Sequence, residues 1–193
     1  LRVLHLYEAD LNLLVGIKWK SAMYNAMKTG TLHPGQYGSV PGVSATTLSL
    51  NEELIRDYTH LTRTNLCTVH SDLASCYDRI ILPVSSLIAR SYGIHRNVVY
   101  VHATNIQASK YKLKLGNKIT DSYYQHQQDW GIYGSGQGSA SSPAIWAFIS
   151  SKLFQSHDSK AHGLPIQMPD GSFNSNIAIT GFVDDTVTYT SGS

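Results

Sequence analysis

Apolar residues recur every three or four positions along five stretches of the chain, which is the period of an amphipathic helix. Gly or Pro stands at several of the boundaries, where such residues commonly stop or start a helix. The pattern predicts helices over residues 9–29, 44–63, 83–92, 97–109 and 143–155.

Two of these helices should each bury one apolar stripe. The expected buried residues are Leu50, Leu54, Tyr58 and Leu61 in the second helix, and Val98, Val101, His102 and Ile106 in the fourth. Ser49 and Glu52 have the spacing of a capping box near the start of the second helix.

Other stretches alternate between apolar and polar residues, as a strand with one buried face does. They are residues 2–7, 66–72, 110–115 and the two halves of 176–190. Gly116-Asn117 predicts a tight turn after the third of these stretches. The polar tract of residues 156–176 predicts irregular chain.

Two adjacent carboxylates, Asp184 and Asp185, interrupt the last alternating stretch where a hairpin turn is expected. Neighbouring like charges destabilise each other, and a divalent cation across the pair would relieve this. Asp is also among the commonest residues of solvated turns, so the pair alone does not decide. Residues 66–72 end on a third carboxylate, Asp72. For the segment that follows Asp72, an equally good interpretation is that its polar groups cap a helix and that Tyr77 is a core residue.

Two segments are rich in glycine. Residues 33–42 contain three Gly and two Pro and must form a shaped loop, either a plain connector or a flap whose amides approach a ligand. Residues 134–138 contain three Gly at alternate positions, which lets another group come close to the backbone. Their spacing is not that of a dinucleotide-binding loop.

Charged residues make up only 15% of the 193 residues, and 42% are hydrophobic. The net charge of +2 permits a polyanionic partner without indicating one. Cys67 and Cys76 lack the spacing of a zinc site or a disulfide scaffold, which fits a reducing compartment. No apolar stretch is long enough to predict a membrane span. We therefore expect an intracellular protein of the nucleus or cytoplasm.

Three short motifs follow one another along the chain: DLASCYD at residues 72–78, GQGSASSP at 136–143 and FVDD at 182–185. In this order they resemble motifs A, B and C of a reverse transcriptase palm. QYGSVPG at residues 36–42 resembles the fingers loop of retrotransposon and group II intron enzymes, although Val40 and Val43 stand where many relatives carry basic residues. The chain thus resembles the RNA-directed DNA polymerase domain of a retrotransposon.

The resemblance implies a metal site and a nucleotide site. Asp72, Asp184 and Asp185 would hold two Mg²⁺ ions, or Mn²⁺ in their place, with Leu73 as a further metal ligand. The residues expected around the incoming nucleotide are Tyr77, Gln137, Gly138 and Phe182. Of these, Tyr77 would lie beneath the sugar and reject a 2′-hydroxyl.

The resemblance also implies the architecture and the partners. We expect an α+β fold of the polymerase right-hand type, with an antiparallel palm sheet backed by helices. Residues 1–66 would be fingers-like and residues 67–193 palm-like, with a fingers-like insertion at about 94–125. The chain would be a fragment that ends before the thumb. Arg2, Lys112 and Lys114 would contact nucleic acid, and the partners would be an RNA template, a DNA primer and dNTPs.

Two hypotheses of function follow. The first is a nucleotidyltransferase that adds dNTPs to a primer 3′-hydroxyl, inactive as this isolated piece. The second is a decayed or repurposed module that keeps the fold, performs no catalysis and binds nucleic acid. A viral RNA polymerase is a weaker third option, because such enzymes usually carry a carboxylate at the position of Tyr77.

Overall fold

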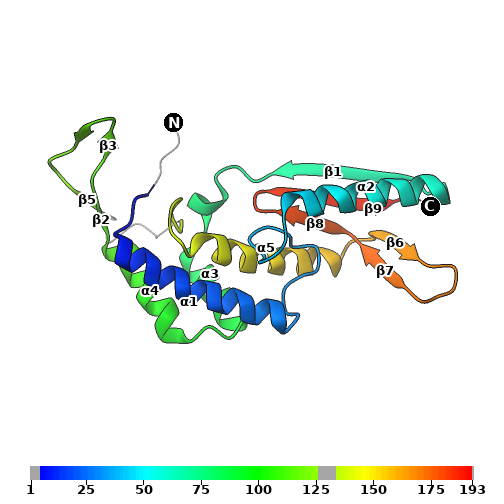
Figure 1. The fold of residues 1–193 in the computed structure, drawn as a ribbon, viewed down its shortest axis with the longest axis horizontal. Coiled ribbons are helices and arrows are strands. Elements are labelled where there is room, and N and C mark those ends of the chain that lie inside the picture. The colour runs from blue at the N-terminus through cyan, green and yellow to red at the C-terminus, as the bar shows by residue number, and fades with distance from the viewer. Residues whose placement is uncertain (1–4, 126–133, 193) are drawn as a thin grey trace.

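The computed structural model describes residues 5–125 and 134–192 and has the expected α+β class (Figure 1). The helices of this part are α1 (Ala9–Lys28), α2 (Ala45–Thr62), α3 (Leu82–Ser91), α4 (Arg96–Ala108) and α5 (Ser142–Asp158), with a 3₁₀ turn η1 (Cys76–Arg79). The strands are β1 (Leu66–Asp72), β2 (Lys110–Tyr111), β3 (Lys114–Leu115), β4 (Lys118–Ile119), β5 (Tyr124–Gln125), β6 (Leu164–Gln167), β7 (Asn174–Ile177), β8 (Ile179–Phe182) and β9 (Asp185–Ser191).

A three-stranded antiparallel sheet in the order β1-β9-β8 forms one end of the molecule, and α1, α3 and α4 form the other (Figure 1). Helix α5 contacts α1, α3 and β8, and so connects the two ends. Helix α2 lies against the sheet, where Ile55 packs with Val187 and Tyr189.

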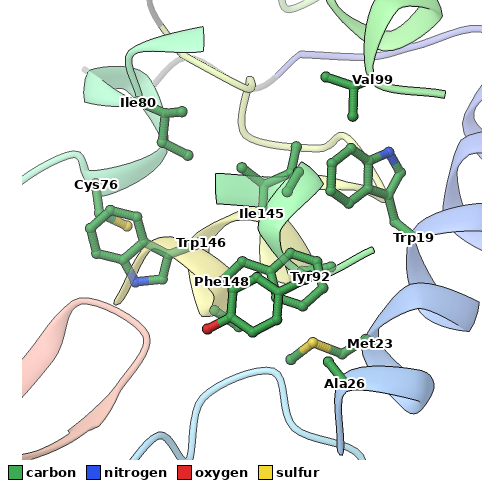
Figure 2. Packing of buried hydrophobic residues seen from close by; sticks show 13 residues of the cluster. Trp19, Met23, Ala26, Cys76, Ile80, Tyr92, Val99, Ile145, Trp146 and Phe148 are labelled. Atoms are coloured by element: carbon green, nitrogen blue, oxygen red, sulfur yellow. The ribbon is translucent and has the colours of Figure 1, made fainter. Parts of the chain in front are cut away.

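The main hydrophobic core surrounds α5 (Figure 2). Trp19 and Met23 of α1 reach it from one side, and Tyr92, next to α3, stacks on Phe148 at a centroid distance of 4.5 Å. Ala147 of α5 has no exposed surface at all. A helix that is buried on most sides serves as the centre of the fold, because each neighbouring helix packs one stripe against it.

The predicted apolar faces of two helices are partly wrong. Helix α2 buries Leu48, Ile55 and Thr59, whereas the predicted Leu50, Leu54 and Leu61 are exposed. Its capping box is formed by Ser44 and Thr47, five residues before the predicted pair. In α4 the buried residues are Val99, His102 and Ile106, and the predicted Val101 is exposed. Each helix carries two apolar stripes, and only the position of its neighbours decides which stripe is buried.

Three predictions about strands also need correction. Residues 164–177, expected to be irregular, contain the antiparallel hairpin β6–β7. The alternating residues 110–115 form two short strands, β2 and β3, rather than one. Within the predicted strand 2–7, residues 5–7 are not in a strand, and the segment before them lies outside the described residues.

Within 5–125 and 134–192, no helix has the length and apolar character needed to cross a membrane.

The buried His102 should make the fold sensitive to acid. Its side chain is 8% exposed, its Nε2 has no hydrogen-bond partner, and burial lowers its pKa to about 4. Between pH 6.5 and 4 the unfolded chain can therefore bind a proton that the folded chain cannot, so stability falls as the pH falls. We expect a loss on the order of 2 kcal/mol at pH 5, which His102→Leu should abolish.

The measurement is the free energy of unfolding at pH 7.5 and at pH 5 for both proteins. The matched control is His162→Leu, which changes an exposed ring and should leave the acid sensitivity as it is in the parent. An equal acid loss in His102→Leu and in the parent would contradict the prediction.

Candidate functional site

Backbone pairing brings the three predicted metal-binding aspartates to one end of the sheet. Strands β1 and β9 pair antiparallel, and the register places Asp72 directly opposite Asp185. Asp184 lies in the turn between β8 and β9, and its carbonyl accepts a hydrogen bond from the Leu73 N–H at 3.0 Å. Main-chain contacts thus join distant segments of the chain at the positions of the acidic residues.

Two of these three aspartates line the same groove. Asp72 and Asp185 line a groove of about 400 Å³ between α2 and the sheet, together with Glu52, His70 and Phe182. We call this the α2 groove. Asp184 is not among its lining residues. Directly opposed like charges destabilise an antiparallel pair, so the pairing of Asp72 with Asp185 has an electrostatic cost.

Asp184 instead acts on the segment that follows β1. Burial raises the pKa of the Cys76 thiol to about 11, and the charge of Asp184 adds to this rise. Burial also raises the pKa of Tyr77 to about 12, with smaller contributions from Cys76 and Asp184. Both groups are therefore neutral at physiological pH. The charge of Asp72 also contributes to the raised pKa of Cys76, though less than that of Asp184.

The donor chemistry of this site fits Mg²⁺, but the side chains are not arranged around a single point. Carboxylate oxygens are the ligands that a hard divalent cation prefers. Among the described residues, however, no group of three or more His, Cys, Asp or Glu side chains is placed so that it could hold a metal ion. Asp72 and Asp185 are exposed at the ends of their strands, and their side chains have room to turn.

The loop of residues 33–42 packs on the β8–β9 hairpin. The Tyr37 N–H donates to the Gly181 carbonyl and the Gly181 N–H donates to the Gly35 carbonyl, both at 2.9 Å. A Cβ at Gly38 would lie 2.2 Å from the Val183 nitrogen, so only glycine allows this approach. The closest contact of Gly35 and Gly38 is thus with the hairpin, and the flap interpretation of residues 33–42 stays a prediction.

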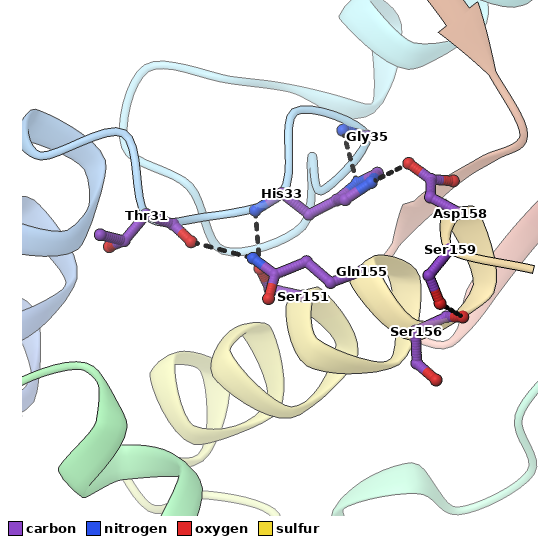
Figure 3. A network of polar contacts seen from close by, with 8 residues as sticks. All are labelled: Thr31, His33, Gly35, Ser151, Gln155, Ser156, Asp158 and Ser159. Atoms are coloured by element: carbon purple, nitrogen blue, oxygen red, sulfur yellow. Dashed lines mark hydrogen bonds and ion pairs between the residues drawn. The ribbon is translucent and has the colours of Figure 1, made fainter.

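Polar contacts fix the same loop to α5 (Figure 3). The His33 backbone N–H donates to Ser151 Oγ at 2.6 Å, and the His33 ring is 2.6 Å from Asp158 Oδ2. The buried Gln36 accepts a hydrogen bond from Ser150 Oγ at 2.8 Å. No predicted role pointed to His33 or Ser150, because their partners are more than a hundred positions away in the sequence.

The predicted nucleotide-site residues are held by protein contacts. Tyr77 is half-buried and follows β1, and its carbonyl accepts a hydrogen bond from the Ser135 N–H. The Gln137 carbonyl accepts from the His5 N–H at 2.7 Å. A Cβ at Gly138 would lie 2.2 Å from the His5 carbonyl oxygen. The group that approaches this glycine-rich segment is thus the residue 5–7 segment. Phe182 ends β8 and is half-buried.

Lys112 and Lys114 lie exposed on a projection formed by β2 to β5, far from the sheet (Figure 1). We call residues 110–125 the lysine-tyrosine hairpin. The Lys112 Nζ stands 4.7 Å from the centre of the Tyr123 ring, and Tyr111 stacks on Tyr124 at 5.4 Å. The sheet aspartates and these lysines therefore do not form one site. Arg2 lies outside the described residues.

Comparisons with known proteins identify solved structures with a similar fold. No family model and no curated protein matches the chain. A telomerase structure from Candida albicans, in complex with a TWJ fragment of telomeric RNA, matches with a TM-score of 0.64 and 14% identity, over 93% of this chain and 29% of that one. An apo telomerase from Candida tropicalis, truncated from its C-terminal domain, matches with a TM-score of 0.57 and 16% identity, over 93% of this chain and 34% of that one.

These likenesses extend over almost the whole of this chain, and the chain spans about a third of the length of the telomerases. At such low identity the comparison concerns the fold. The chain shares its fold with part of telomerase, a polymerase related to reverse transcriptases.

Proposed function

We propose that this chain is the fingers and palm part of an RNA-directed DNA polymerase from a retroelement. In this proposal Asp72, Asp184 and Asp185 hold two Mg²⁺ ions, with Leu73 beside them. The ions would activate the primer 3′-hydroxyl and stabilise charge on the triphosphate. The substrates are dNTPs, an RNA template and a DNA primer. The telomerase of one matched structure is bound to RNA, which supports a nucleic-acid partner for this fold.

The observation that carries the proposal is the register of β1 and β9. It sets Asp72 opposite Asp185 and places Asp184 in the adjoining turn, within a fold shared with a polymerase. An ordinary solvated turn gives no reason for a third carboxylate on the neighbouring strand. A bound cation would offset the repulsion within the acidic cluster, and the exposed carboxylates could turn toward it.

The charge distribution gives a second support. Residues 79–121 contain seven basic side chains and a single acidic one, Asp121. The basic residues are Arg79, Arg90, Arg96, Lys110, Lys112, Lys114 and Lys118. In the lysine-tyrosine hairpin, Lys112 lies over the Tyr123 ring and Tyr111 stacks on Tyr124, and basic side chains beside aromatic rings are the combination that binds a phosphate backbone and stacks on bases.

The alternative is a module that binds nucleic acid without catalysis. It is favoured by the metal geometry, since no group of three ligating side chains is preformed among the described residues. The basic segment 79–121 would serve this function equally well. The first measurable difference between the two proposals is the response to Mg²⁺.

Mg²⁺ should stabilise the parent chain through its acidic cluster. Without metal, Asp185→Asn should raise stability by roughly a few tenths of a kcal/mol, because it removes one of two opposed charges. With Mg²⁺, the melting temperature of the parent should rise more than that of the variant. Asp57→Asn on the exposed face of α2 is the matched control and should keep the parent's Mg²⁺ response. Equal Mg²⁺ shifts in parent and Asp185→Asn would remove Asp185 from the metal site.

Lys112 and Lys114 should contribute to nucleic-acid binding through phosphate contacts. Changing both to Gln should lower the slope of log K against log salt by about 1.4 to 1.8, since each phosphate contact contributes about 0.7 to 0.9. Fluorescence anisotropy with a labelled RNA–DNA hybrid at several salt concentrations measures this slope. Lys160→Gln, exposed after α5, should leave it unchanged. An unaltered slope in the double variant would exclude the hairpin from the interface.

Tyr77 should select deoxyribonucleotides. A 2′-hydroxyl above this half-buried ring would lose hydration, so we expect the parent with Mg²⁺ and primer–template to bind dNTP about 10²-fold more tightly than rNTP. Tyr77→Ala should bring this ratio close to one, whereas Tyr77→Phe should keep it. The ratio of the two dissociation constants is the measurement. If Tyr77→Ala retains the parent's ratio, Tyr77 is a core aromatic only.

A further inference from the structure

We propose that Trp146 is a positioning residue for the acidic turn: its indole N–H holds Val183 in a left-handed conformation and so fixes the direction of Asp184. That Asp184 then holds a metal ion rests on the proposed function. Trp146 lies in α5, and no sequence motif assigns it a role. Its effect on the turn follows from the backbone conformation and the contacts described next.

Val183 adopts a conformation that a β-branched residue rarely accepts. Its φ is 57°, in the left-handed region, where the Cβ crowds the backbone. Among the described residues, Ser39, Arg63 and Ser75 also have positive φ, and none of these is β-branched. Such strain persists only where the surroundings impose it, and it is typical of functional sites.

The Trp146 indole supplies one of these constraints. Its Nε1 donates a hydrogen bond to the Val183 carbonyl at 2.5 Å, and the side chain is 7% exposed. Figure 2 shows the indole beside the hairpin, with Cys76 next to its ring. Because the ring is packed in the main core, the donor has a fixed position and the carbonyl has to meet it there.

Two further contacts close the turn around this bond. On one side the backbone of Gly38 presses against the Val183 nitrogen, where no side chain would fit. On the other side the Leu73 N–H holds the Asp184 carbonyl at 3.0 Å. Both carbonyls of the turn are thus bonded, and rotation of either peptide would break a hydrogen bond. The backbone that carries the Asp184 side chain is therefore fixed.

Trp146→Phe is the informative variant, because it keeps an aromatic ring in the core and removes only the donor. We expect the dissociation constant for Mg²⁺, measured by calorimetry with Mg²⁺ alone, to rise about tenfold, the loss expected for one buried hydrogen bond. Trp19→Phe is the matched control: it alters another buried indole of the same core, which packs against His102, and should leave Mg²⁺ affinity unchanged.

Val183→Gly tests the left-handed conformation itself. Glycine adopts positive φ without strain, so the turn no longer needs the indole to hold it. In this background Trp146→Phe should change Mg²⁺ affinity by less than about threefold, and the effects of the two substitutions on the denaturant midpoint should be non-additive. Additive effects on the midpoint, together with an unchanged Mg²⁺ affinity in Trp146→Phe, would overturn the inference.

The same set separates this inference from the proposed function. If the parent and Asp184→Asn respond identically to Mg²⁺, the metal site is wrong and the proposed function loses its support. The double-mutant cycle of Trp146 and Val183 in denaturant still decides the inference in that case, because it requires no metal. Coupling between the two residues supports the positioning role, and strict additivity rejects it.

Discussion

The antiparallel pairing of β1 with β9 is the constraint on which the rest of the site depends. It is the contact that sets Asp72 against Asp185, and a shift of one residue in the register would move every side chain of a strand to the other face. The groove under α2 depends on this alignment, because residues of β1 and of β9 line it. Main-chain hydrogen bonds along seven residue pairs hold it.

Helix α5 connects the helical core to this sheet, because it contacts α1 and α3 as well as β8. It presents large rings to the helical end, where Phe148 stacks on Tyr92, and small polar groups to the loop of residues 33–42. The serines of α5 allow the loop to come close, and the loop then packs on β8 through Gly35 and Gly38. The acidic turn therefore packs against a loop and a helix that are themselves well packed and hydrogen-bonded, while Asp72 and Asp185 stay exposed.

The electrostatics of the molecule are divided between its two ends. The sheet end carries the three aspartates of the site, whereas the segment of residues 79–121 carries seven of the 15 Lys and Arg residues and a single acidic residue. In the proposed function the acidic end would hold a cation and the basic segment would contact a phosphate backbone. The absence of a preformed three-ligand group among the described residues favours the alternative of a module without catalysis.

Much of the local structure could be predicted from the sequence, since it depends on neighbours in the chain. The periods of apolar residues located α1 to α5, and alternation located β1 and the β8–β9 hairpin, because helix and strand formation depend on residues a few positions apart. The acidic residues at the ends of these strands could be picked out for the same reason. Which stripe of α2 is buried could not, because Val187 and Tyr189 decide it from the far end of the chain. The hydrogen bond of Trp146 could not be predicted either, because a buried aromatic residue in a helix has the same sequence pattern whether or not its N–H has a partner. Tertiary structure alone decided the separation of Asp184 from the α2 groove, because adjacent residues at a turn are directed by backbone dihedrals that long-range contacts impose.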